Sequence, residues 1–377
     1  MKLLFVHDHK FRKVGNAIYS TGGLNNEVLE RYSKMVSQVT VIARILEEKQ
    51  SENKWSKITN KKILIKGNKN LFYGNLKKEM LTCDKMIIRL PSFLGLQALR
   101  LNRKIRKPYM IEMVACPWDA LWNHGITGKI LAPYVFFRNR QEVKSAPMVL
   151  YVTNQFLQSR YPTKGQSIGC SDVVISDCNE NILNSRLEKI VHCEKKKILG
   201  TIAATNVKYK GQQYIIEALG RLKLQGNKNY EYQLVGNGDS SFLKSIAKKN
   251  NVEEQVKFIG GLSHEKIFDW LDSIDIYVQP SRQEGMPRAL IEAMSRGVPA
   301  FGANTGGIPE LLSDQYLFSN SSTNINEIIE ILSLFQKNTM IQLAKQNYEI
   351  AKEYQEKKLQ EVRERFYLNF YSSSYTG

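Results

Sequence analysis

The sequence predicts an α/β protein built from two doubly wound domains. Its length of 377 residues is enough for two domains of about 150 residues each. Strand-like segments alternate with helix-like segments along both halves of the chain. Hydrophobic residues make up 42% of the chain and charged residues 24%, a composition typical of folded proteins that excludes a wholly disordered, collagen-like or coiled-coil chain.

The first half begins with a short apolar strand pattern and continues with alternating helical patterns. The expected strands cover residues 2–7, 39–43, 85–90, 108–114, 148–152 and 172–175. The expected helices cover residues 24–36, 93–106 and 129–144. This alternation is typical of a parallel sheet with crossover helices, and it predicts a Rossmann-like N-terminal domain over residues 1–180.

The second half repeats this arrangement. The expected strands cover residues 198–203, 232–235, 256–259, 274–279 and 300–303. The expected helices cover residues 212–224, 242–250, 265–271 and 288–296. We predict a second domain over residues 195–340, joined to the first between residues 177 and 197. A long charged helix over residues 340–368 has spare length to reach back to the first domain, so we treat 341–377 as a separate C-terminal segment.

Positive charge is concentrated in one half of the chain. The net charge is +18, and residues 1–190 hold 31 Lys and Arg against 15 Asp and Glu, or +16. Such a field attracts an anionic partner: a phosphate-bearing substrate, nucleic acid or the acidic surface of a membrane. A solvated lysine-rich surface is the alternative. In residues 96–107, Arg100, Arg103 and Lys104 follow helical spacing opposite Leu99, a pattern typical of an amphipathic helix at a membrane surface.

Several classes of site lack their sequence patterns. The five cysteines form no C-x-x-C pair, and the chain has neither H-E-x-x-H nor a D-x-D pair, so we predict no disulfide framework, no dedicated metal and no cofactor. No apolar run approaches the roughly 18 residues of a membrane span, and the first residues lack the features of a signal peptide. The predicted location is the cytoplasm, with peripheral association at the inner face of the cell membrane.

The segment 275–297 carries the most informative motif. Its strand ends near Pro280, and Pro287 suits the first position of the helix that follows. Ligands of open α/β sheets bind at this end of the strands, and the free N–H groups of a helix start suit a diphosphate. Glu284 and Glu292, with seven residues between them, are placed to accept hydrogen bonds from sugar hydroxyls at two ends of one ligand. The motif predicts a nucleotide-sugar site; two surface glutamates are the alternative.

This motif resembles that of the GT4 group of retaining glycosyltransferases, which have the GT-B fold. The resemblance rests on the E-x7-E spacing with Gly285, Ala293 and Met294, on the sequence Gly-Val-Pro at 297–299 and on the sequence at 305–311, and it extends over most of residues 195–312. It implies two Rossmann-like domains that face a cleft, with a C-terminal helix reaching back to the first domain. It also implies a nucleoside diphosphate sugar as donor, used without a metal and with retention of anomeric configuration.

The resemblance assigns roles to residues of the second domain. Glu284 is placed on the sugar hydroxyls, Glu292 on the nucleotide ribose and Lys210 on the diphosphate, whose negative charge grows as the glycosidic bond breaks. The backbone that approaches the diphosphate and sugar belongs to Gly285, Met286, Pro287, Arg288, Ala289 and Leu290.

The remaining expected donor contacts are a second cation for the diphosphate and two glycine turns. The family has an arginine a few residues before the lysine, and here the nearby positions hold Thr201, Ala203 and Ala204. Lys208 and Arg288 are candidate replacements, although Lys208 equally suits a plain surface position. Gly236 resembles the glycine turn after a strand, which a structural turn also explains. In the first domain, Gly22 and Gly23 match the family's glycine pair, with an ordinary tight turn as the alternative.

The acceptor side is expected after the strand at 108–114. Trp118 and Trp122 offer flat rings on which a sugar could stack. Asp119 and His124 are candidates for orienting the acceptor hydroxyl, with a helix-capping aspartate and a core or surface histidine as the alternatives.

Taken together, these features predict a retaining glycosyltransferase that uses a UDP- or GDP-sugar. The expected acceptor is a saccharide carried on a lipid at an anionic membrane surface, in the synthesis of a cell-surface polysaccharide. The alternatives are another GT-B nucleotide-sugar enzyme, such as an epimerase, or a basic nucleic-acid-binding protein. The glutamate pair would repel a polyanion, so we expect no nucleic acid as partner.

Overall fold

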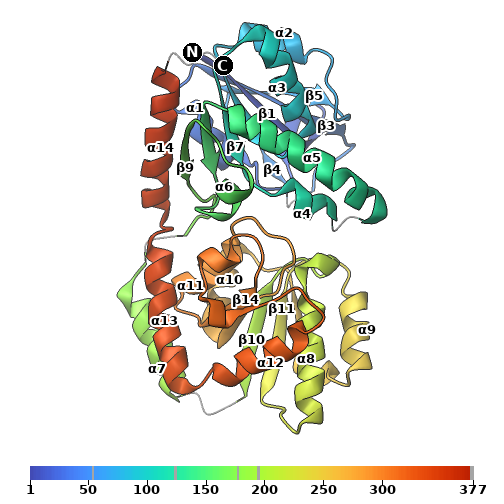
Figure 1. Ribbon diagram of the computed structural model, residues 1–377, viewed down its shortest axis with the longest axis vertical. Helices are drawn as coiled ribbons and strands as arrows, with labels where there is room; N and C mark the ends of the chain where they lie inside the picture. Colours follow the sequence, from blue (N-terminus) through green and yellow to red (C-terminus); the bar gives the residue numbers. More distant parts are fainter. Residues whose placement is uncertain (53–54, 123–124, 176–177, 193–195, 374–377) are drawn as a thin grey trace. The chain divides into compact units, whose positions relative to one another are not determined.

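The computed structural model describes residues 1–52, 55–122, 125–175, 178–192 and 196–373. The chain forms two compact units, one made of Met1–Cys170 with Glu364–Gly377 and the other of Ser171–Arg363. Figure 1 shows a sheet flanked by helices in each unit. The first unit ends ten residues earlier than the predicted boundary at 180, and the second continues beyond 340 to Arg363.

The first unit contains a mainly parallel sheet. Its described strands follow the order β4-β2-β1-β6-β7-β8-β9, with β3 paired to β1 and β5 paired to β3. Only the contacts of β2 with β1 and β4 are antiparallel. The strands are β1 (Lys2–Val14), β2 (Ala17–Ser20), β3 (Gln38–Glu47), β4 (Ser56–Lys57), β5 (Ile63–Asn68), β6 (Lys85–Leu90), β7 (Tyr109–Met113), β8 (Met148–Tyr151) and β9 (Gln166–Gly169).

Helices cover both faces of this sheet because alternate strand residues are buried on opposite sides. One face packs against α2, α3 and α5 through a core that includes Leu4, Val6 and Ile88. On the other face, Phe5 contacts Tyr32 of α1, with ring centroids 4.7 Å apart. The described helices are α1 (Asn26–Ser33), α2 (Leu76–Thr82), α3 (Phe93–Ile105), α4 (Pro117–Trp122), α5 (Gly125–Ser145) and α6 (Phe156–Arg160).

The C-terminal part of α14 (Glu356–Ser372) belongs to the first unit, as predicted for the end of the chain. Tyr367 stacks on Tyr32 at 5.8 Å and donates a hydrogen bond to the buried carboxylate of Glu112. Lys34 of the first unit forms an ion pair with Glu364 at 2.7 Å. These contacts secure the helix on the same face as α1.

The second unit contains a fully parallel sheet in the order β12-β11-β10-β13-β14-β15. Its strands are β10 (Lys197–Ile202), β11 (Tyr230–Val235), β12 (Val256–Gly260), β13 (Ile276–Gln279), β14 (Ala300–Ala303) and β15 (Leu317–Phe318). The longer helices are α7 (Glu180–His192), α8 (Gln212–Leu224), α9 (Ser241–Lys249), α10 (His264–Ser273), α11 (Arg288–Ser295), α12 (Asn324–Leu334) and α13 (Lys337–Lys352). The order reverses at β10 and β13, the place where open α/β sheets bind ligands.

Three sequence predictions require correction. The first strand does not end at His7 but continues to Val14, through an irregularity between Val6 and Lys10, and then forms a hairpin with β2. Within residues 172–175, only an isolated bridge from Ile175 to Gln355 takes the place of the expected strand. The expected helix over 340–368 is divided into α13 and α14, with the break beside that same bridge.

Across the described ranges, the structure has no helix that is both long enough and apolar enough to cross a bilayer.

Candidate functional site

Lys210 and Glu284 meet at the carboxyl ends of the central strands of the second unit. Lys210 lies in a short 3-10 turn after β10, and Glu284 lies in the loop after β13. The Lys210 Nζ atom is 2.6 Å from Glu284 Oε1, and Nε2 of the buried Gln279 donates to the same oxygen at 3.1 Å. Glu284 Oε2 has no partner among the described residues, so the carboxylate retains one oxygen for a ligand.

The turn that carries Lys210 is locked by the glycine that follows it. Gly211 has φ +78°, and a Cβ atom there would lie 1.8 Å from the carbonyl oxygen of Pro280. The backbone after β10 therefore contacts the backbone at the end of β13 directly, which only glycine permits. This contact brings the lysine beside Glu284 although 74 residues separate them.

Glu292 lies inside α11, and its side chain is partly buried. Burial raises the pKa of Glu292, and the nearby His264 and Arg288 oppose this effect. The carboxylate makes no hydrogen bond to any described residue. A partly desolvated carboxylate without a protein donor is suited to receive hydroxyl groups from a ligand.

The start of α11 has free backbone donors, as the motif predicted, but its cap differs. Pro287 is the N-cap residue, one position before the first helical residue Arg288, and no side chain caps the helix. The preceding loop is held by a hydrogen bond from Gly307 N to Gly285 O at 2.8 Å. Met286, Pro287 and Leu290 are buried, and Gly285 and Ala289 are partly buried.

The two candidates for a second phosphate-binding cation differ in their surroundings. The Lys208 ammonium lies over the ring of Phe242 on α9, 4.5 Å from its centroid. The Arg288 side chain is exposed at the first position of α11 and influences Glu292 electrostatically. Gly236 follows β11, and its N–H donates to the carbonyl of Gly260 at 2.9 Å.

In the first unit, the predicted glycine pair lies between β2 and α1. Gly22 and Gly23 are both exposed. Gly22 lies beside the imidazole of His9, whose Nε2 is 2.9 Å from the hydroxyl of Ser20. Sequence reasoning missed His9 because the first strand was expected to end before it.

The predicted acceptor residues that the structure describes lie on α4 and contact other protein side chains. Trp118 and Trp122 stack on each other, with centroids 5.1 Å apart and an angle of 13° between their planes. Asp119 forms an ion pair with Arg160 at 3.0 Å, which joins α4 to α6. His124 lies outside the described residues.

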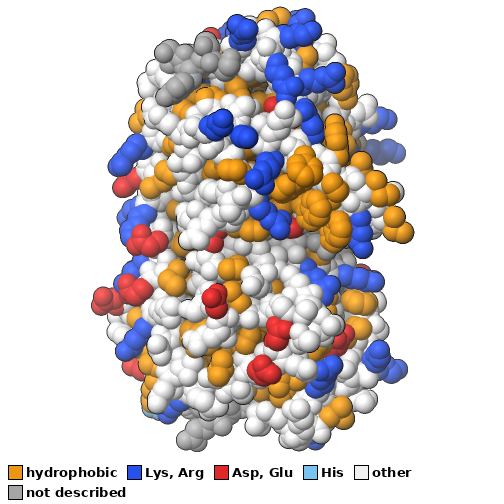
Figure 2. Space-filling view, viewed as in Figure 1, with side chains coloured by type: hydrophobic (Ala, Val, Ile, Leu, Met, Phe, Trp, Pro, Cys, Tyr) orange, Lys and Arg blue, Asp and Glu red, His pale blue; other side chains and the backbone are white. Residues whose placement is uncertain are grey.

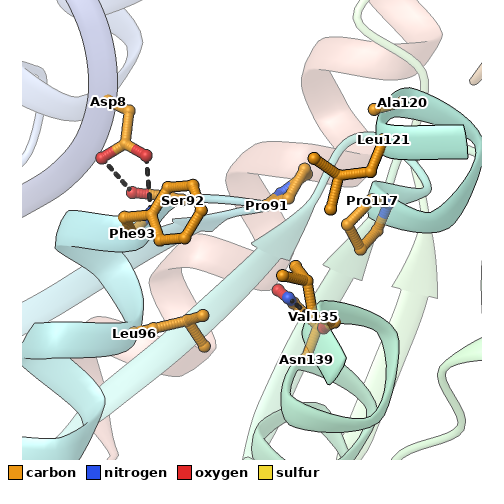
Figure 3. Close-up of a pocket in the computed structure, with 10 residues that line it drawn as sticks. All are labelled: Asp8, Pro91, Ser92, Phe93, Leu96, Pro117, Ala120, Leu121, Val135 and Asn139. Carbon is orange, nitrogen blue, oxygen red and sulfur yellow. Dashed lines mark hydrogen bonds between the residues drawn. The ribbon is translucent and has the colours of Figure 1, made fainter. Parts of the chain in front are cut away.

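A pocket opens beside these residues at the carboxyl ends of β6 and β7, as shown in Figure 3. Its apolar lining includes Pro91, Pro117 and Leu121. Asp8, which accepts hydrogen bonds from Ser92 and from backbone N–H groups at the start of α3, and the fully buried Asn139 supply polar groups. Asn139 donates to the Val135 carbonyl at 2.7 Å, whereas its own Oδ1 is buried without a partner.

Of the predicted acceptor residues that the structure describes, neither Trp118 nor Asp119 nor Trp122 lines this pocket. Its polar groups come from β1, from the N-cap of α3 and from α5, and they form no motif that one sequence could reveal. Within the part of the chain that the structure describes, no group of three or more His, Cys, Asp or Glu side chains is arranged to hold a metal ion.

Comparisons with known proteins agree with this architecture. The model of the family described as "Glycosyl transferases group 1" matches residues 185–354. Protein CapJ of Staphylococcus aureus is 34% identical over 332 residues, which cover 84% of this chain and 82% of CapJ. The amylovoran biosynthesis glycosyltransferase AmsK of Erwinia amylovora is 36% identical over 136 residues, which cover 34% of this chain and 32% of AmsK.

Among solved structures, HepE of Anabaena in complex with UDP matches with a TM-score of 0.64 and 14% identity, over 98% of this chain and 100% of that chain. The two parallel α/β units thus have the GT-B architecture of glycosyltransferases, as the sequence predicted. The chain belongs to the group 1 glycosyltransferases.

Proposed function

We propose that the protein transfers a sugar from a UDP- or GDP-sugar to a saccharide acceptor, with retention of anomeric configuration and without a dedicated metal. The observation that carries this proposal is the contact of Lys210 with Glu284 beside the uncapped start of α11. It places a cation, a carboxylate and free N–H groups next to one another. The UDP complex of HepE supports a nucleotide donor for the same fold.

Each group has a task in this proposal. Lys210 and the first N–H groups of α11 hold the diphosphate, Glu284 accepts hydrogen bonds from the donor sugar, and Glu292 accepts them from the ribose. In the reaction, the bond from the anomeric carbon to the diphosphate oxygen breaks, and a bond to the acceptor oxygen forms on the same face. The acceptor hydroxyl proton passes to the departing diphosphate. Lys210 stabilises the charge that this group gains.

The acceptor binds in the pocket of the first unit in this proposal. Asp8 and Asn139 offer oxygen acceptors to sugar hydroxyls, while Pro117 and Leu121 offer apolar surface to the sugar ring. The name of the AmsK relative, a glycosyltransferase of amylovoran biosynthesis, supports a role in assembling a cell-surface polysaccharide. We further propose that the acceptor is carried on a lipid at the anionic inner face of the cell membrane, since most of the positive charge lies in residues 1–190.

Calorimetric titration with UDP and with GDP, both in EDTA, tests the donor site. We expect one nucleotide to bind saturably and Glu292→Ala to weaken that binding by about 10- to 100-fold, the effect of losing hydrogen bonds to a charged acceptor. Glu330→Ala, an exposed glutamate on α12, is the matched control and should bind as the wild type does. Absence of binding to both nucleotides would refute the donor assignment.

A further inference from the structure

One face of α5 is apolar, exposed and covered by no described part of the chain. Its largest members are Ile126, Ile130, Tyr134 and Phe137, with 80%, 72%, 65% and 65% of their surface exposed, respectively. Spacings of four, four and three residues place them in one stripe about 17 Å long. With the neighbouring Leu131, 49% exposed, these residues are called the α5 stripe below. Figure 2 shows hydrophobic side chains gathered over this helix.

The described core of the first unit does not include the α5 stripe. The opposite face of α5 packs on the first unit through Gly128, Ala132, Val135 and Val143, which are all buried. The helix is therefore apolar on two sides, and only one of them belongs to the core. Soluble chains rarely leave so many large apolar side chains together on one surface, and such patches mark contact with another apolar partner.

Positive charge surrounds the α5 stripe. Residues 93–145 contain nine Lys and Arg but three Asp and Glu. All three acids are paired with arginines: Glu112 with Arg89, Asp119 with Arg160, and Glu142 with Arg103 and Arg138. The remaining exposed cations include Lys129 of α5, and Figure 2 shows Lys and Arg side chains at the border of the hydrophobic area.

The helix that the sequence favoured for membrane contact cannot insert. The apolar side of α3 is buried, with Leu94, Ala98 and Leu99 in the core of the first unit. Its exposed side carries Arg100 and Lys104. Apart from Phe93 at its first position, α3 therefore supplies mainly charge, and α5 supplies the apolar stripe that the sequence pattern did not reveal.

We propose that the α5 stripe inserts into the interfacial region of an anionic lipid bilayer, with the cations of α3 and α5 on the lipid headgroups. An apolar stripe bordered by cations is the arrangement of a helix that lies in the membrane interface. A second copy of the chain is a poor occupant, because it would bring two positively charged surfaces together. The inference deepens the proposed function and rests on it, since insertion here anchors the unit that carries the acceptor pocket at the surface where a lipid-linked acceptor lies.

Cosedimentation of the full chain with vesicles tests the insertion. We expect binding to vesicles of phosphatidylcholine with phosphatidylglycerol and at least about tenfold weaker binding to phosphatidylcholine alone.

Three double variants test which side chains are responsible. Ile130→Ser with Tyr134→Ser should reduce binding at least tenfold, since both side chains leave water on insertion. Leu224→Ser with Leu334→Ser, exposed apolar residues of the second unit, is the matched control and should bind as the wild type does. Arg100→Gln with Lys104→Gln should weaken binding by about fivefold per residue.

A second measurement reports the position of the helix directly. Lipids brominated in the acyl chain should quench the fluorescence of Trp122, 43% exposed on α4 beside Lys129, and Trp122→Phe should remove the quenched component.

Two outcomes would overturn the inference. One is equal vesicle binding by the wild type and by the variant with both Ile130→Ser and Tyr134→Ser. The other is that neither protein binds lipid, while the wild type forms an oligomer that this variant has lost. UDP titration on the same samples separates the two proposals: retained nucleotide binding without vesicle binding refutes only the membrane contact, and the reverse refutes only the donor site.

Discussion

At the scale of single residues, the donor site depends on one lysine held beside one glutamate. We expect Lys210→Ala to lower kcat/KM by about 10²- to 10³-fold, because the charge on the leaving diphosphate loses its nearest cation. Lys208→Ala removes a cation two residues away whose ammonium lies over Phe242, and it should cost less than about threefold. Initial rates of nucleotide release for both variants check this prediction. Equal decreases in kcat/KM for the two variants would show that Lys210 has no special role in stabilising the leaving diphosphate.

Gly211 is the residue whose backbone makes that contact possible. Gly211→Ala combines a strained φ with a clash between Cβ and the Pro280 carbonyl, and should reduce the free energy of unfolding by about 2 kcal/mol or more. Gly226→Ala is a matched control, because Gly226 has a similar φ of +84° and no atom within 4 Å of the added Cβ. It should cost about 1 kcal/mol. Urea unfolding at equilibrium measures both, and equal costs would contradict the proposed close packing.

The acceptor pocket also depends on one side chain. Asn139→Leu keeps the branched shape and the number of heavy atoms of the side chain, and it removes both the unpaired Oδ1 atom and the Nδ2 group that donates to Val135. We expect a rise of about tenfold in KM for the acceptor with little change in the dissociation constant for UDP, since one hydrogen bond to a hydroxyl is lost in a dry pocket. Steady-state kinetics with varied acceptor measures the first quantity, and calorimetry measures the second. A parallel change in both would point to misfolding of the first unit instead.

At the scale of elements, β1 carries two partly buried histidines that link stability to pH. Burial and the neighbouring Arg89 guanidinium lower the pKa of His7 to about 3 and that of His9 to about 4. Both residues titrate near pH 6.5 in the unfolded chain, so below that pH the unfolded state binds more protons than the folded state. Stability should therefore fall as the pH decreases from about 6.5 to about 4, by at most about 1.4 kcal/mol per pH unit for each histidine.

Denaturant unfolding at pH 7.5, 6.0 and 5.0 measures this slope. His9→Gln should reduce it and His192→Gln, an exposed histidine at the end of α7, should leave it unchanged. Above about pH 7, these histidines should add no pH dependence to the free energy of unfolding, because their side chains are then neutral in both the folded and the unfolded chain. A slope that is the same in wild type and in His9→Gln would contradict the burial of this side chain in its neutral form.

The elements differ in how far sequence could predict them. The prediction for α8 over 212–224 agrees with the structure at both ends, because a glycine precedes the helix and an apolar periodicity runs through it. The extension of β1 to Val14 was missed because its polar and basic residues hide the strand pattern, and because they pair with the adjacent β2 in a hairpin and with the more distant β3. The division between α13 and α14 depends on the bridge from Ile175 to Gln355, a contact that no local pattern contains.

The same limit applies to the site. Glu284 and Glu292 were found because their spacing forms a motif, and Lys210 was assigned by the resemblance to the family; their roles stay predictions that the titrations above test. The ion pair of Asp119 with Arg160, 41 residues away, and the unpaired oxygen of Asn139 depend on packing between α4, α5 and α6. The sequence predicted a crossover helix over 129–144, and only the burial of one face of α5 and the exposure of the other reveal the α5 stripe.

At the scale of the whole molecule, the two units should respond differently to nucleotide and to loss of the C-terminus. The proposed donor residues Lys210, Glu284 and Glu292 all belong to Ser171–Arg363, so UDP or GDP at 100 times its dissociation constant should stabilise that unit by about 2.7 kcal/mol.

The first unit includes Glu364–Gly377, which supplies Tyr367 to the buried Glu112. Truncation after Arg363 leaves Glu112 with Tyr32 and Arg89 as donors but removes the Tyr367 hydroxyl and the ring that stacks on Tyr32, and it should lower the transition of the first unit selectively. Calorimetric scans with and without nucleotide check both expectations, because the truncated chain should retain the transition that nucleotide shifts. A single transition that nucleotide and truncation move together would show that the two units unfold as one.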